Sequence, residues 1–415
     1  ACLAIVFGGA LLVPAVLRAL GRIGSRLMWR FTKIEPYLAN ANLLGSIPRI
    51  SISVAALAIS FSMLTAIAIM IGSFRETVEY WVQQTLKADL YLKPVTGQSL
   101  SAESTISSEV VQKVTSNPMV AAVDRFVSFD ISYQGSLVVL GSGDFPVLLE
   151  RGALLFKSPR EGRSAMRKAI GKDVVIVSES FSLRYKKDVG DILFLNTLKG
   201  RSPFRVGAVY YDYSFDRGII VLDRRTLLKH YGVQAPRSLM VYLKDGVDSE
   251  IVRSQIVAGL TDKYRLMVHT NNSLRAEVLR IFDSTFAITY ALELIAICVA
   301  ILGVASTIFT LVMDRKFELS VLRWIGADRR QVRRIVIIEA TLVGMVSQSV
   351  GVVTGLLLSL ILVFVINVQS FGWTIQFHIP AGFLVQSSLL ILLATSLSGV
   401  YPGYLASRMN LNPDI

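Results

Sequence analysis

Residues 314–334 read DRKFELSVLRWIGADRRQVRR and lie between two long apolar segments. This stretch contains seven of the 43 Lys and Arg residues of the chain. In its first half, apolar residues recur at helical spacing and predict a short helix with one apolar face. These apolar residues are Phe317, Val321, Trp324 and Ile325.

The second half of the stretch contains signals for a corner between two helices. Gly326 suits the left-handed position just past a helix end. Asp328 suits the N-cap of a new helix, with Gln331 three residues later to complete a capping box. Four arginines then lead directly into apolar sequence: Arg329, Arg330, Arg333 and Arg334. This pattern is expected where a helix on a membrane surface turns into a spanning one.

The composition of the chain supports a membrane location. Of its 415 residues 53% are hydrophobic and only 18% are charged, and the mean hydropathy is +0.54. This balance is too apolar for an ordinary soluble protein. The net charge of +13 would suggest nucleic acid if it formed a patch on a soluble domain, but much of it lies beside apolar spans. No nucleic-acid partner is therefore expected.

Five apolar stretches are long enough to cross a membrane: 1–20, 50–74, 281–313, 335–368 and 381–404. Small residues within them, including Gly351 and Gly355, favour close helix packing. Residues 75–280 are mixed in composition and long enough for a core of their own, with a β-rich part at about 173–225. The sequence predicts an α-helical membrane protein with about five transmembrane helices and a large extracytoplasmic α+β domain that contains a β-rich subdomain.

The distribution of basic residues predicts the orientation. Outside the large domain they gather mainly in 21–49 and 314–334, whereas the loop 369–380 contains neither Lys nor Arg. The positive-inside rule therefore predicts that the linker 21–49, the stretch 314–334 and the tail 405–415 are cytoplasmic. Residues 75–280 and the loop 369–380 are then expected outside the cell membrane.

Catalytic and cofactor motifs are missing from the sequence. It contains no G-x-x-x-x-G-K-[ST], so this chain is not expected to bind or hydrolyse ATP, and no cofactor, metal site or catalytic residue is predicted. Its three histidines, His230, His269 and His378, are far apart and are interpreted as structural. Cys2 and Cys298 lie in apolar segments and are interpreted as packing residues.

Two acids lie inside predicted spans. Glu293 lies well inside the third span, where a functional role and a hydrogen-bonded contact in the bundle are both open. Glu339 lies about one turn into the fourth span and is expected to form an ion pair with the preceding turn or an adjacent helix.

The stretch ELSVLRWIGADRRQ at 318–331, followed by Glu339 and Ala340, resembles the FtsX-like permease family of ABC transporters, which includes MacB, LolC and LolE. The resemblance covers about residues 45–415, with Trp324 in place of the usual smaller residue. The sequence begins ACLAIVF, with no Met and no charged leader. Residues 1–20 resemble the connecting helix of ten-span permeases, so the chain is expected to be the second half of one.

The resemblance implies that residues 314–334 bind a separate ABC ATPase subunit, which binds the ATP, at the inner membrane of a bacterium. A simpler hypothesis is that the arginines only bind lipid headgroups and set topology. Further partners implied are a second permease half or homodimer partner, and an envelope substrate (lipid, lipoprotein or peptide) or a hydrolase. An alternative function is a membrane regulator that activates a cell-wall hydrolase or senses a ligand. The residues expected to contact the ATPase are Phe317, Glu318, Val321, Leu322, Arg323, Gly326, Ala327, Asp328, Arg329 and Arg330.

Overall fold

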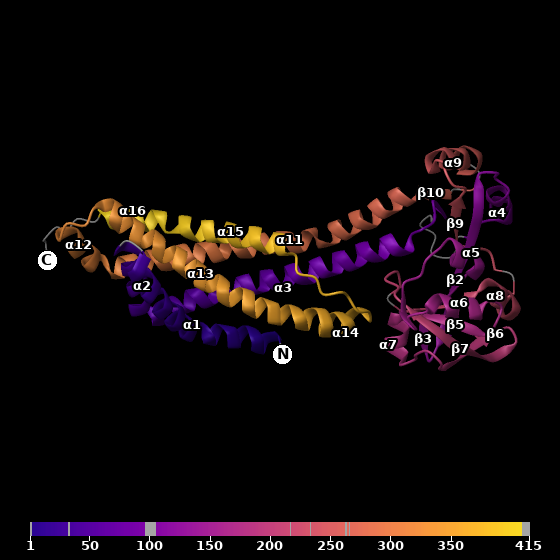
Figure 1. Cartoon of the computed structure of the whole chain (residues 1–415), viewed down its shortest axis with the longest axis horizontal. Coiled ribbons are helices and arrows are strands. Elements are labelled where there is room, and N and C mark those ends of the chain that lie inside the picture. The colour runs from indigo at the N-terminus through magenta and orange to yellow at the C-terminus, as the bar shows by residue number, and fades with distance from the viewer. Residues whose placement is uncertain are drawn as a thin grey trace. The chain divides into compact units, whose positions relative to one another are not determined.

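The computed structural model describes residues 2–31, 34–95, 105–215, 217–232, 234–261, 264 and 266–408 (Figure 1). The chain forms two compact units. The helical unit comprises residues 1–74, 285–366 and 376–415, and the sheet unit comprises residues 75–284 and 367–375. The chain therefore passes between the two units four times.

The helical unit is built from long helices joined by short turns. Among the described residues, four helical segments are long and apolar enough to cross a membrane: Cys2–Ile23, Ile50–Thr85, Arg329–Phe371 and Ala381–Ser407. The third predicted span, 281–313, lies within one helix, of which Ile301–Asp314 is a shorter apolar part. The helices are α1 (Cys2–Phe31), α2 (Ile34–Gly45), α3 (Ile47–Thr85), α11 (Asn271–Asp314), α12 (Lys316–Trp324), α13 (Arg329–Ile361), η2 (Leu362–Ile366), α15 (Ala381–Ser398) and α16 (Val400–Arg408).

Helix α13 packs against α1, α2, α15 and α16, and two of its glycines allow a close approach to α3. A Cβ on Gly351 would lie 2.9 Å from the Ala58 carbonyl oxygen of α3, and one on Gly355 would lie 2.8 Å from the Ser62 carbonyl oxygen. The predicted close packing of small residues is confirmed at this crossing. The core is formed by apolar residues of α1, α2, α3, α11, α12, α13 and α16.

The sheet unit contains a ten-stranded mixed sheet in the order β10-β1-β9-β2-β3-β8-β5-β7-β4, with β6 paired to β7. The strands are β1 (Leu90–Pro94), β2 (Val120–Tyr133), β3 (Ser136–Gly143), β4 (Phe156–Ser158), β5 (Val174–Ser178), β6 (Ile192–Thr197), β7 (Gly200–Tyr210), β8 (Ile219–Asp223), β9 (Ser238–Leu243) and β10 (Leu266–Thr270). Between and beside them lie α4 (Ser108–Thr115), α5 (Phe145–Glu150), α6 (Gly162–Ala169), α7 (Glu179–Tyr185), α8 (Arg224–Tyr231), α9 (Ser249–Ile256), η1 (Val257–Thr261) and α14 (Asn367–Phe371).

Strand β2 connects the two halves of the sheet. Its first half, from Val120 to Phe126, pairs with β9, and its second half, from Val127 to Tyr133, pairs with β3. One half, with β1, β9, β10, α4 and α9, has its own apolar core. The other half, around β3 to β8, has two further cores and contains the predicted β-rich range 173–225.

Two helices continue from predicted spans into the sheet unit. Helix α3 runs unbroken through residues 74 and 75, and α11 runs unbroken through residues 284 and 285. Each of these two helices therefore belongs to both units. The long helix α3 is separated from α2 by a break, because α2 ends at Gly45 and α3 begins at Ile47.

Candidate functional site

The corner at 314–334 has the backbone geometry that its sequence predicts. Helix α12 ends in a Schellman motif: the Ala327 N–H donates to the Leu322 carbonyl at 3.0 Å, and the Gly326 N–H donates to the Arg323 carbonyl at 3.1 Å. Gly326 has φ +108°, a conformation that disfavours any side chain. A capping box begins α13, with the Asp328 N–H donating to Gln331 Oε1 at 2.9 Å. The turn between α12 and α13 is therefore fixed by hydrogen bonds from backbone N–H groups, to carbonyls at the end of α12 and to the Gln331 side chain at the start of α13.

The buried side of α12 is not the apolar face that the sequence spacing suggested. Leu319 and Ser320 are buried, and Leu322 packs against the core of the helical unit together with Ala327. In contrast, Phe317, Trp324 and Ile325 are 70%, 76% and 78% exposed. We call these three side chains the corner surface. Together they expose a large apolar surface on a turn whose backbone is fixed, and such surfaces are typical of protein–protein interfaces.

Charged residues are also exposed in the stretch 314–334. Glu318, Asp328, Arg329 and Arg330 are exposed, and Val321 and Arg323 are half-buried. Exposed apolar side chains together with charges of both signs suit contact with another protein.

Glu339 lies behind the corner and joins three elements. Its side chain is buried and forms an ion pair with Arg315, between α11 and α12, with Arg315 Nη2 at 3.3 Å from Glu339 Oε2. Asn42 of α2 donates to Glu339 Oε1 at 2.7 Å. The sequence expectation of an ion pair with an adjacent element is confirmed, and the structure identifies Arg315 as the partner. Removing either charge would leave the other buried without its partner.

Glu293 lies within α11, and its side chain is outside the described part of the structure. Its role therefore stays as open as the sequence left it.

A second polar centre, in the sheet unit, involves the segment between α14 and α15. Glu179, in the first turn of α7, is fully buried and bonds to Lys157 Nζ at 2.7 Å. Its two carboxylate oxygens also accept hydrogen bonds from Thr374 Oγ1 at 2.8 Å and from the Thr374 backbone N–H at 3.0 Å. Residues 367–375 are thus bound to the sheet unit by a charge-assisted pair of bonds.

Aromatic residues complete this centre. Tyr213 donates from its hydroxyl to the Thr374 carbonyl at 3.1 Å, and its ring meets Trp373 edge-on at 5.4 Å. Trp81, on the continuation of α3, lies edge-on to Tyr213 and donates from Nε1 to the Tyr211 carbonyl at 3.1 Å. The tyrosine cluster 210–213 thus makes contacts within the chain. The same cluster holds residues 367–375 and the end of α3.

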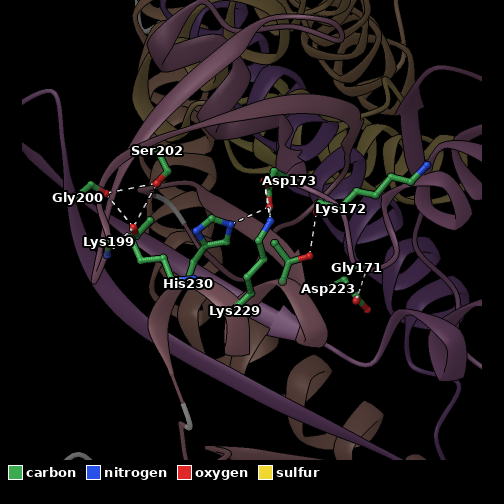
Figure 2. A network of polar contacts seen from close by, with 11 residues as sticks. Gly171, Lys172, Asp173, Lys199, Gly200, Ser202, Asp223, Lys229 and His230 are labelled. Carbon is green, nitrogen blue, oxygen red and sulfur yellow. Dashed lines mark hydrogen bonds and ion pairs between the residues drawn. The ribbon is translucent and has the colours of Figure 1, made fainter.

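Another polar network surrounds His230, as Figure 2 shows. His230 Nε2 lies 2.8 Å from Asp173 Oδ1, and Lys229 Nζ lies 2.9 Å from the same carboxylate. Burial raises the pKa of Asp173, but the bonds from Lys229 and His230 outweigh it and leave that pKa below its ordinary value. His230 Nδ1 is buried with no hydrogen-bond partner among the described residues. Ser202 Oγ instead lies 3.3 Å from Thr197 Oγ1 and donates to the Gly200 carbonyl at 3.5 Å.

Sequence comparisons identify both parts of the molecule. Residues 51–258 match the model of the MacB-like periplasmic core domain, and residues 290–411 match the model of the FtsX-like permease C-terminal. The fold and these matches define a membrane protein with an extracytoplasmic domain, which is the sheet unit. The chain belongs to the FtsX-like permease family, in its MacB-type branch of ABC transporter permeases.

Two relatives and one solved structure are similar to parts of this chain. An uncharacterized ABC transporter permease protein of Mycobacterium tuberculosis is 31% identical over 410 residues, which are 97% of this chain and 46% of the relative. The macrolide export ATP-binding/permease protein MacB 2 of Aeromonas hydrophila is 24% identical over 310 residues, which are 70% of this chain and 44% of the relative. The chain thus spans about half the length of these relatives. The periplasmic region of MacB from Actinobacillus actinomycetemcomitans aligns with 48% of this chain and 95% of its own, at 14% identity and a TM-score of 0.34.

Proposed function

We propose that this chain is a permease subunit whose corner at 314–334 lies in the cytoplasm and binds a separate ABC ATPase. Nucleotide-driven movement of the corner would then pass along α3 and α11 to the extracytoplasmic domain. The proposal places the protein in the bacterial inner membrane with its C-terminus in the cytoplasm. The single observation that carries it is the exposure of Phe317, Trp324 and Ile325 on a corner with two fixed helix ends.

The structure of the corner favours a protein partner over lipid headgroups alone. Headgroup binding needs only arginines near the surface, and imposes no particular geometry on the turn. The Schellman motif and capping box hold the corner surface in one orientation, which favours a shaped partner. The Glu339–Arg315 pair links this corner to α13, so a force on α12 has a buried path into the helical unit.

The partner and substrate follow from the family. No phosphate-binding G-x-x-x-x-G-K-[ST] motif occurs in the 415 residues, so the ATPase is proposed on another subunit. Because the chain spans about half of its curated relatives, a second permease half or a second copy is proposed to complete the membrane part. Envelope lipids, lipoproteins or peptides are the proposed substrates, and copurified material identified by mass spectrometry tests this point.

The test of coupling is ATPase stimulation by the full-length membrane protein. Phe317→Ala with Trp324→Ala should weaken ATPase binding at least tenfold, because truncation of aromatic interface centres typically costs about 2 kcal/mol or more. The charge reversal Arg329→Glu should also reduce stimulation. Phe7→Ala is the matched control, since Phe7 on α1 is 62% exposed but lies outside the corner. Full stimulation by the double variant, measured at limiting ATPase concentration, would refute the assignment.

A further inference from the structure

An open groove of about 850 Å³ lies in the extracytoplasmic domain, beside the point where β2 passes from one half of the sheet to the other. One wall is formed by residues along α4, from Ser107 to Ser116, and another by residues 234–236. The Ile106 N–H donates to the Pro236 carbonyl at 2.7 Å and joins these walls. The lining residues are Thr105, Ile106, Ser107, Ser108, Val111, Gln112, Thr115, Ser116, Arg125, Arg224, Gln234, Ala235 and Pro236.

The described lining of this groove carries positive charge. Among the residues that the structure describes, the lining includes Arg125 and Arg224 and no acid. Both arginines lie near Asp144: Arg125 Nε is 3.1 Å from Asp144 Oδ2, and Arg224 Nε is 3.9 Å from Asp144 Oδ1. The buried Asp124 also interacts with both arginines, but burial raises its pKa to about 7, so it is only partly ionised near neutral pH. The two guanidinium charges therefore exceed the carboxylate charge around them.

The two arginines also retain hydrogen-bonding capacity. Each guanidinium has five N–H donors. In the described structure Arg125 uses Nε and Nη2 on Asp144, and Arg224 uses Nη1 in a 3.5 Å bond to the Arg125 carbonyl. Burial and the like charge of Arg125 lower the pKa of the Arg224 guanidinium. A bound anion would reduce the repulsion between the two guanidinium groups and accept hydrogen bonds from their remaining N–H groups.

The rest of the lining is suited to a polar molecule. Five hydroxyl side chains and two amide side chains face the groove, from Thr105, Ser107, Ser108, Thr115, Ser116, Gln112 and Gln234. Hydroxyl and amide groups both donate and accept, so they can bind the hydroxyl groups of a polyol. The volume is in the range of small-molecule sites.

We propose that this groove binds a ligand that has one phosphate or carboxylate group on a polyol body. Arg125 and Arg224 bind the anionic group, and the hydroxyl and amide side chains bind the polyol. Such a ligand is either a soluble molecule or the headgroup of an anionic lipid. The proposal is independent of the coupling role of the corner, which lies in the other unit.

Hydrogen exchange of the full-length protein tests the proposal. The protein is placed in phosphatidylcholine nanodiscs and titrated with glycerol 3-phosphate or inorganic phosphate, with chloride at matched ionic strength as the control. Saturable protection of residues 105–116 is expected, with glycerol 3-phosphate binding more tightly than phosphate. Nanodiscs that contain phosphatidylglycerol distinguish a soluble ligand from a lipid headgroup. Protection of residues 105–116 in these nanodiscs, without added ligand, identifies a lipid headgroup.

Matched variants locate the site. Arg224→Gln removes one charged partner and should raise the half-saturating concentration about tenfold or more, since hydrogen bonds to charged groups contribute about 1.5–3 kcal/mol. Arg225→Gln is the control, because Arg225 is exposed and does not line the groove. Ser108→Trp fills the groove at an exposed position without changing its charge and should also abolish protection. The proposal is overturned if no probe gives saturable protection in the unmodified protein, or if Arg225→Gln weakens binding as much as Arg224→Gln does.

Discussion

Asp124 in β2 allows a quantitative test of electrostatics in the extracytoplasmic domain. Its side chain is fully buried, Oδ1 accepts the Asp144 N–H at 2.6 Å, and Oδ2 has no hydrogen-bond partner among the described residues. Burial, and to a lesser degree the charge of Asp144, raises the pKa of Asp124 to about 7, against the opposing effects of Arg125 and Arg224. The folded domain therefore prefers the protonated acid.

The sign of the pH dependence follows from this preference. The folded pKa is raised above the ordinary value of 3.8, so the contribution of Asp124 to stability is complete below about pH 4 and is lost as the pH rises through about 7. Between these values the folded state holds one more proton at this site than the unfolded state. The free energy of unfolding should therefore fall by up to about 1.4 kcal/mol per pH unit through this group.

Asp124→Asn is the matched perturbation, because an amide has the shape of the protonated acid and keeps an oxygen for the Asp144 N–H. Hydrogen exchange of β2 and β3 amides in the full-length protein, from pH 5 to pH 8, gives the opening free energies. The opening free energy of the variant, relative to that of the unmodified protein, should rise by up to about 1.4 kcal/mol per pH unit from pH 5 and level off above about pH 7. Equal slopes for the two proteins would refute the reasoning, since other titrating groups contribute equally to both.

Three further perturbations test other parts of the structure. Gly326→Ala places a side chain at φ +108°, where a Cβ would meet no neighbouring atom. Thermal unfolding should show a loss of about 1–3 kcal/mol in stability, together with reduced ATPase stimulation, and backbone strain alone would cause this loss. Glu339→Ala leaves Arg315 largely buried without its carboxylate and should destabilise the helical unit by about 3–5 kcal/mol in a denaturant titration, whereas an unchanged midpoint would contradict a structural role for the pair. Glu179→Ala removes both acceptors from the segment 367–375, and hydrogen exchange of that segment should speed up about tenfold or more; unchanged exchange would show that the aromatic contacts suffice.

Local rules of helix ending were sufficient to predict the corner. Gly326 and Asp328 each have a conformational preference that depends on one or two neighbouring residues, so their roles could be predicted from sequence. Which side of α12 is buried depends on where α11 and α13 lie. Spacing alone therefore grouped Trp324 with the apolar face but could not show that this face is exposed.

The partner of Glu339 illustrates the same limit. Arg333 and Arg334 are nearest to it in sequence, but residues five or six apart do not face each other on a helix. The corner instead brings Arg315 to it from the junction between α11 and α12. Helical spacing excludes the two nearer arginines as partners of Glu339. No sequence signal indicates Asn42, which lies on a helix almost 300 residues earlier.

The contact between Glu179 and Thr374 had no sequence signal at all. Glu179 follows a buried strand and reads as an ordinary acid in the first turn of a helix, and Thr374 lies in a short loop between two spans. The two positions are 195 residues apart. Only the folded chain reveals that one binds the other.

The extracytoplasmic domain is consequently discontinuous along the chain. A recombinant fragment cut at residues 75 and 284 would lack 367–375 and would leave the Glu179 carboxylate without the Thr374 hydrogen bonds and Tyr213 without the Thr374 carbonyl. Such a fragment would also expose the ring of Tyr213 that Trp373 covers. A soluble version of this domain for binding studies should therefore carry the nine residues on a flexible tether, so that the segment can return to its place.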